Sequence, residues 1–134
     1  MAGMKRQLTL YSELIDSGNL LVGACHKASL LGGWWDDVIH TPGGIDSVTP
    51  TKLMLIVSEI SEAMEGHRKN LMDSHLPNRT AFEVELADAV IRICDLAGAH
   101  NLDLGGAIEE KLRYNKQRQD HSKEARAGEH GKRY

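Results

Sequence analysis

Two pairs of acidic residues constrain this chain more than any other feature of its sequence. Both have the spacing carboxylate-x-x-carboxylate within a stretch of helical periodicity, Glu59 with Glu62 and Glu85 with Asp88. Residues three apart share one face of a helix, so each pair directs its two carboxylates the same way. Converging carboxylates repel one another unless a cation neutralises them. The all-oxygen donor set therefore predicts a site for a hard divalent ion, Mg²⁺ or Mn²⁺.

The composition is typical of one reduced, globular domain. A length of 134 residues suffices for a core without disulfides or structural zinc. The net charge of −3 provides no electrostatic drive toward nucleic acid or an anionic membrane. Cys25 and Cys94 stand apart inside apolar patterns, which favours a cytoplasmic protein. The longest apolar run, at 53–57, is too short to span a membrane, and no signal-peptide pattern follows the basic residues near the start.

The periodicity predicts an all-α fold with four main helices, and a short helix at about 8–15 would make a fifth. The main helices are expected to cover residues 17 or 19 to 31, 50 to about 70, 81 to about 100 and 104 to about 119. Residues 1–119 are thus expected to form a single domain, a four-to-five-helix bundle. The polar segment at 120–134 is expected to be a mobile tail.

Capping signals define the ends of these helices. The first helix should stop at the pair Gly32-Gly33. Thr49 followed by Pro50 is typical of an N-cap and a first helical residue, and predicts the start of the second helix. A capping box, Thr80 to Glu83, predicts the start of the third helix, and Asp103 can cap the fourth.

Helical wheels place the acidic pairs on strips that can face each other across the bundle. The apolar stripe of the second predicted helix lies roughly opposite its two glutamates and contains Leu53, Ile56, Val57, Ile60 and Met64. The third predicted helix is apolar almost all round, and its narrow polar strip holds Glu85, Asp88, Arg92 and Asp95. A helix so apolar packs on several sides, so this strip must face water or a site. Arg92 either serves that site or forms an ordinary i,i+4 ion pair with Asp88.

Polar residues continue the apolar stripe of the fourth predicted helix. Lys111, Asn115 and Arg118 take the inward positions where the helix leaves the core. Cations beside a metal-loaded acidic slot suit a polyphosphate ligand. The alternative is a frayed, solvated helix end.

The adjacent tryptophans Trp34 and Trp35 stand out because aromatic residues are scarce. They follow the Gly-Gly turn and precede two aspartates, so at least one should lie near the surface. Such residues serve as core or interface anchors, or as platforms on which a nucleobase stacks.

Taken in order, these motifs resemble the MazG-like all-α nucleoside triphosphate pyrophosphohydrolases, which include dimeric dUTPases and dCTP pyrophosphatases. The residues that carry the resemblance are Ser58-Glu59-Ile60-Ser61-Glu62-Ala63, then Glu85-Leu86-Ala87-Asp88-Ala89-Val90, then Lys111-Leu112-Arg113-Tyr114-Asn115-Lys116-Gln117-Arg118. The segment from His26 to Asp36 is similar to the base-side part of these enzymes, particularly of phage-encoded members. The resemblance covers about residues 20 to 119, and the polar stretch before His130 departs from it.

The resemblance implies an oligomeric enzyme that hydrolyses a nucleoside triphosphate to the monophosphate and pyrophosphate. Glu59, Glu62, Glu85 and Asp88 would be its catalytic, metal-binding residues, with Glu59 orienting or deprotonating the attacking water. Residues on substrate-binding positions would be His26, Trp35, Arg92, Lys111, Asn115 and Arg118. A homodimer or homotetramer is expected, in the host cytoplasm if a phage encodes the chain. Phage-type relatives favour a guanine substrate, dGTP or GTP.

Three other classes of protein remain open. Di-iron and di-manganese bundles also place acids on facing helices, but they use Glu-x-x-His pairs, and neither acidic pair here has the histidine. A non-catalytic nucleotide-binding module would keep the bundle without turnover. A helical interaction protein would simply leave its acidic strips in water.

Overall fold

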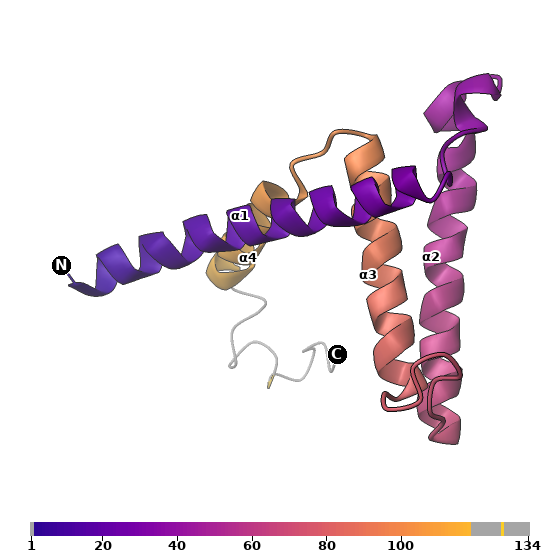
Figure 1. Cartoon of the computed structure of the whole chain (residues 1–134). Coiled ribbons are helices and arrows are strands. Elements are labelled where there is room, and N and C mark those ends of the chain that lie inside the picture. Colours follow the sequence, from indigo (N-terminus) through magenta and orange to yellow (C-terminus); the bar gives the residue numbers. More distant parts are fainter. Residues whose placement is uncertain (1, 119–126, 128–134) are drawn as a thin grey trace. The chain divides into compact units, whose positions relative to one another are not determined.

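Helices are the regular secondary structure of the described residues, which contain no strand and one isolated bridge between Met72 and Thr80, so the predicted all-α class is confirmed. The computed structural model describes residues 2–118 and 127 (Figure 1). Its elements in these residues are α1 (Ala2–Leu31), the 3₁₀ helix η1 (Val38–His40), α2 (Gly44–Lys69), α3 (Ala81–Ala99) and α4 (Leu104–Gln117). Apart from residue 127, the predicted tail at 120–134 lies outside the described residues. None of the helices in the described ranges is long and apolar enough to cross a membrane.

The chain divides into two compact units, and α1 belongs to both. One unit comprises residues 1–19 and 103–134, and the other comprises residues 20–102. In the first unit, Asn19 joins α1 to the start of α4: its Nδ2 donates to Asp103 Oδ1 at 2.7 Å, and its Oδ1 accepts from the Gly105 N–H at 2.9 Å. The two predicted acidic pairs both lie in the second unit.

The first helix is longer than the sequence predicts. A start at Ser17 or Asn19, with a separate short helix before it, is wrong, because α1 runs without a break from Ala2. Asn19 has an N-cap's chemistry, but its side chain is engaged by α4 instead. The predicted end is confirmed at Leu31, where Gly33 adopts φ +78°, a backbone conformation that favours glycine.

The second helix also begins earlier than predicted. Its N-cap is Gly43, and Pro50 lies inside the helix, so the interpretation of Thr49 and Pro50 as the start is wrong. Pro50 lacks the N–H that would bond the carbonyl four residues back. Thr49 is engaged within the fold, since its Oγ1 donates to the Ile45 carbonyl and lies 2.8 Å from His100 Nε2. The predicted end is confirmed, with Asn70 as a left-handed C-cap at φ 53°.

The third and fourth helices begin where their capping signals predict. Thr80 Oγ1 accepts from the Glu83 N–H at 3.2 Å, and Asp103 Oδ1 accepts from the Gly106 N–H at 3.0 Å. The Glu83 carboxylate pairs with Arg79 Nη1 at 2.6 Å. Local side-chain chemistry therefore decides both starts.

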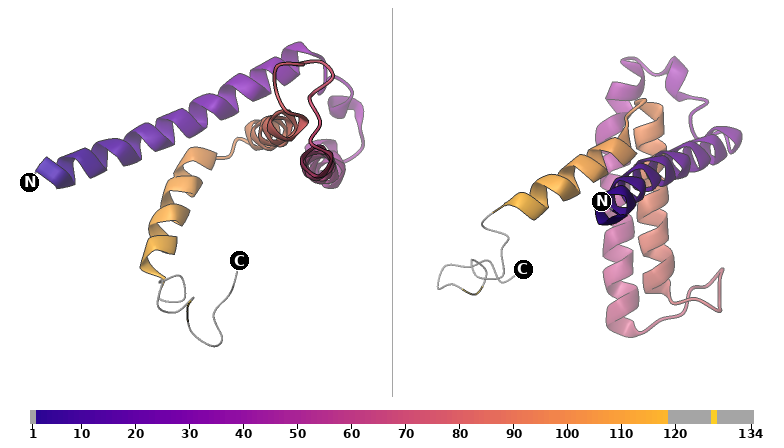
Figure 2. Two further views of the ribbon diagram at one scale, coloured as in Figure 1. Left: turned by 90° about the horizontal axis from the view of Figure 1, so that it is seen from below. Right: turned by 90° about the vertical axis from the view of Figure 1, so that its left-hand side faces the viewer.

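In the second unit, α2 and α3 lie side by side, as both views of Figure 2 show. The two helices approach closely at Gly66, where an added Cβ would lie 2.9 Å from that of Ala81. The part of α1 from residue 20 onward meets α3 at His26 and Gly98. A small core forms around Trp35, Val38, Leu96 and Ala99, with Ile45, Val48 and Ile56 packed against it.

The apolar stripe predicted for α2 is largely exposed. Leu53, Val57, Ile60 and Met64 are 48% to 64% exposed, whereas the buried residues of α2 are Glu59, Ala63 and Gly66. The helix thus turns its acidic side toward α3.

Candidate metal centre

Three of the four predicted acids meet between α2 and α3. Glu59, Glu85 and Asp88 each offer a carboxylate oxygen within 4.8 Å of the others. Glu59 lies on the face of α2 that packs on α3 and is only 7% exposed, while Glu85 and Asp88 are half-buried, one turn apart on α3. Carboxylate oxygens at this spacing can share one divalent cation. The helix pair thus brings together a donor set of the predicted chemistry.

The acids perturb one another strongly. Burial, then a hydrogen bond with Glu59, then the charges of Glu62, Glu59 and Asp88 raise the pKa of Glu85 to about 7. Burial and the charge of Glu59 raise the pKa of Asp88, while the Arg92 guanidinium opposes that rise. The cluster therefore resists carrying its full negative charge, and a bound cation would relieve the repulsion.

Glu62 stands at the edge of this group. Its side chain is exposed, and it is not one of the three acids whose oxygens come within 4.8 Å of one another. Its charge nevertheless raises the pKa of Glu85, which places it near the cluster.

Asp73 is a further acid near the site, and sequence reasoning did not place it there. Its charge contributes to the raised pKa of Asp88. Asp73 is buried, and its Oδ1 accepts hydrogen bonds from the N–H groups of His75 and Leu76 at 2.9 and 2.6 Å. The run Asp73-Ser74-His75 is a recognisable turn signal, but it indicates only the loop and not what the loop approaches.

Arg92 pairs across the helices. Its Nε donates to Glu59 Oε1 at 2.6 Å. The ion pair between Arg92 and Asp88 that the sequence left open is thus replaced by one that links α3 to α2. The Glu59 side chain is 9% exposed, and the Arg92 side chain is 42% exposed.

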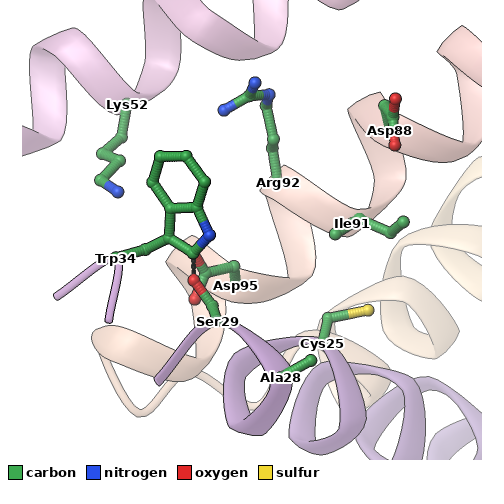
Figure 3. Close-up of a pocket in the computed structure, with 9 residues that line it drawn as sticks. All are labelled: Cys25, Ala28, Ser29, Trp34, Lys52, Asp88, Ile91, Arg92 and Asp95. Carbon is green, nitrogen blue, oxygen red and sulfur yellow. Dashed lines mark hydrogen bonds between the residues drawn. The ribbon is translucent and has the colours of Figure 1, made fainter. Parts of the chain in front are cut away.

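A pocket of about 350 Å³ adjoins the acids (Figure 3). Its wall includes Ser29, Trp34, Lys52, Asp88, Arg92 and Asp95. In Figure 3 the indole of Trp34 lies between the side chains of Lys52 and Arg92, with Asp88 farther along α3. The pocket therefore combines an aromatic surface, two cations and one of the clustered carboxylates.

The two tryptophans have different environments. Trp35, which the resemblance maps onto a base-contacting position, is 7% exposed, and its Nε1 donates to Asp95 Oδ1 at 2.8 Å. Trp34 is 72% exposed and lines the pocket. The position of the pair between the Gly-Gly turn and two aspartates predicted that at least one of them would lie near the surface, but not which one.

Asp95, in the wall of this pocket, interacts with three other side chains. Besides Trp35, it accepts a hydrogen bond from Ser29 Oγ at 2.8 Å, and its Oδ1 lies 2.8 Å from His26 Nδ1. His26 and Trp35 thus hold Asp95 rather than line the pocket. The carboxylate ties α1 and the segment after it to α3, a role that its place in the predicted polar strip did not reveal.

Lys111, Asn115 and Arg118 belong to the other compact unit, at the C-terminal end of α4. Lys111 Nζ lies 4.8 Å from the centre of the Tyr114 ring, and Arg118 Cζ lies 6.0 Å from it. Asn115 Oδ1 is buried and has no hydrogen-bond partner among the described residues. Their contact with a triphosphate stays a prediction.

Comparison with known proteins returned no match. No protein-family model fits the chain, and no curated protein or solved structure is significantly similar to it. Function must therefore be inferred from the residues and the geometry described above.

Proposed function

We propose that this chain is a metal-dependent nucleoside triphosphate pyrophosphohydrolase of the MazG-like type. It would convert a ribo- or deoxyribonucleoside triphosphate, with dGTP or GTP favoured, to the monophosphate and pyrophosphate. The observation that carries the proposal is the convergence of Glu59, Glu85 and Asp88 beside a pocket lined by Trp34 and two cations. Neither feature alone indicates a triphosphate, but together they match its charge and its base.

The donor set fits Mg²⁺ or Mn²⁺, since all three converging groups are carboxylates. Glu59, Glu85 and Asp88 would hold the ion, with Glu62 close enough to add an oxygen. Bound there, the ion would offset phosphate charge and lower the pKa of a water molecule. The proposed task of the carboxylates is to fix that position, and Glu59 would also orient the water for attack on phosphorus.

The pocket supplies the remaining contacts of the proposal. Lys52 and Arg92 would oppose the charge of the triphosphate, and the exposed indole of Trp34 offers a surface for base stacking. A volume of about 350 Å³ is within the range of small-molecule sites. Lys111, Asn115 and Arg118 are proposed as further phosphate or sugar ligands.

The exposed stripe on α2 supports a homodimer or homotetramer. Leu53, Val57, Ile60 and Met64 form an apolar surface that a single copy leaves in water. A second copy that packs the same stripe against it would bury this surface symmetrically.

A substrate panel tests the proposed function. The canonical ribo- and deoxyribonucleoside triphosphates are incubated with the full chain and Mg²⁺ or Mn²⁺, and the monophosphate and pyrophosphate are measured. Release of both products in equal amounts, lost in Asp88→Asn, is the expected result. Thermal stabilisation by Mn²⁺ and nucleotide without turnover would instead identify a non-catalytic binding module. No stabilisation and no turnover would indicate an interaction protein.

A further inference from the structure

We propose that Arg92 is an exchange residue: it neutralises Glu59 while no divalent ion is bound, and on ion binding it turns into the pocket to bind the triphosphate. This inference rests on the proposed function. It assigns Arg92 two partners in succession, a carboxylate and then a phosphate. Arg92 would thereby couple occupation of the carboxylate cluster to affinity for the nucleotide.

The first observation is that Glu59 can serve two partners, Arg92 and a divalent ion. It contributes an oxygen to the cluster with Glu85 and Asp88, and its Oε1 is 2.6 Å from Arg92 Nε. A buried carboxylate is costly without a countercharge, and the guanidinium provides one. Once Glu59 binds a divalent ion, the same carboxylate no longer needs Arg92, and the ion repels the guanidinium.

The second observation is that the Arg92 side chain is much more exposed than the carboxylate with which it pairs. The side chain of Arg92 is 42% exposed, whereas that of Glu59 is 9% exposed, so the acid is fixed and the base is at the surface. The ion pair engages Nε, and an arginine side chain offers further N–H donors for a second partner.

The third observation is the place to which Arg92 would move. Arg92 lines the pocket together with Asp88, Lys52 and Trp34. In Figure 3 the Arg92 side chain stands between the indole of Trp34 and Asp88. A phosphate chain that starts at the carboxylate cluster and ends at the indole would pass Arg92, whose planar fork binds phosphate oxygens in pairs.

Titration calorimetry of the full chain tests this exchange. Mn²⁺ alone, and then a non-hydrolysable α,β-methylene triphosphate with Mn²⁺, are titrated at pH 8 into wild type, Arg92→Gln and Arg92→Lys. Arg79→Gln is the control, because Arg79 forms an equally short ion pair with Glu83 on the exposed surface of the same unit. Its values should match those of the wild type.

Opposite shifts are the signature of exchange. Arg92→Gln should bind Mn²⁺ about fivefold more tightly, because the competing cation is gone, and should bind the analogue about tenfold more weakly or worse. Arg92→Lys keeps the charge but not the fork, so it should keep Mn²⁺ affinity within about twofold and still lose analogue affinity. The lysine variant decides the question if the glutamine variant fails to fold.

Other outcomes overturn the inference. Weaker Mn²⁺ binding in both variants would show that Arg92 only positions Glu59. Unchanged affinities would show that Arg92 has no role in binding either the ion or the nucleotide. Both results leave the proposed function standing as long as wild type binds Mn²⁺ and Asp88→Asn does not. No Mn²⁺ binding by wild type would instead overturn the metal site and this inference together.

Discussion

The two faces of α2 invert the usual arrangement of a globular helix. Toward α3 the helix buries Glu59, with only Ala63 and Gly66 as small neighbours. On the opposite side, Val57 and Ile60 are 50% and 48% exposed. A chain that folds to bury apolar surface would place these faces the other way round.

The inversion leaves acidic groups on the inner face of α2 and apolar groups on its outer face, and the proposed function gives each face a partner. The inner face gathers carboxylates whose mutual repulsion raises the pKa of Glu85 to about 7. The outer face offers apolar surface without a partner in the described part of the chain. We infer that a cation completes the first face and a second copy the second.

Removing a carboxylate from the inner face should have the largest effect. Asp88→Asn or Glu59→Gln should lower the rate of pyrophosphate release by about 10²-fold or more, since residues that bind the metal directly matter at least as much as the groups behind them. Pyrophosphate release at saturating Mg²⁺ measures this. Glu65→Gln is the control, because Glu65 lies on the same helix and, within the described residues, forms its ion pairs with Arg68 and Lys69, away from the cluster. Near-wild-type activity in Asp88→Asn would refute the site.

A charge on the outer face should have the next largest effect. Ile60→Asp would bury a carboxylate in the proposed contact between copies, so the association should weaken by about a hundredfold, or about 3 kcal/mol. Sedimentation velocity over a concentration series measures the shift to monomer. Thr51→Asp, at an exposed position on another side of α2, should leave the mass unchanged. An unchanged mass for Ile60→Asp would place the interface elsewhere.

Loss of the Asp95 carboxylate should destabilise the fold around the pocket, although Asp95 is not one of the proposed metal ligands. In Asp95→Asn, an amide replaces one of the oxygens that accept hydrogen bonds from Ser29 and Trp35. The free energy of unfolding should fall by about 1–3 kcal/mol, as urea denaturation would report. Asp37→Asn is the control, because Asp37 is exposed and its side chain makes no capping hydrogen bond. Equal stability in both variants would show that the contacts of Asp95 matter little.

The smallest effect is a dependence of stability on pH. The pKa of Glu85 is about 7 in the folded chain and 4.5 ordinarily, so between these values the folded state holds more protons than the unfolded state. Its contribution to stability is therefore full below pH 4.5 and is lost as pH rises to 7. Urea midpoints of the metal-free chain between pH 5 and 8 should fall less steeply in Glu85→Gln than in wild type. Mn²⁺ affinity should rise over the same window, and identical slopes in both proteins would contradict the coupling.

The sequence predicts best those features that depend on near neighbours. The starts of α3 and α4 follow from Thr80 and Asp103, whose side chains cap N–H groups three residues away. The spacing within each acidic pair follows from helical geometry. These relations need no knowledge of the rest of the fold.

Contacts between distant residues explain what the sequence could not predict. The start of α2 was misplaced because Thr49 is engaged by His100 rather than acting as a cap. Arg92 selects Glu59, on another helix, over the residue one turn before it. Trp35, which the resemblance maps onto the base, is buried with its indole N–H bonded to Asp95, and Trp34 lines the pocket.

The close approach at Gly66 has a consequence for ion choice. An added Cβ there would meet the Ala81 Cβ at 2.9 Å and the Phe82 backbone nitrogen at 3.1 Å, so any larger residue must push α2 and α3 apart. The oxygens of Glu59 belong to one of those helices and those of Glu85 and Asp88 to the other. Under the proposed function, the helix separation that Gly66 permits would influence which ion the carboxylates bind, and a wider gap would suit calcium better than magnesium.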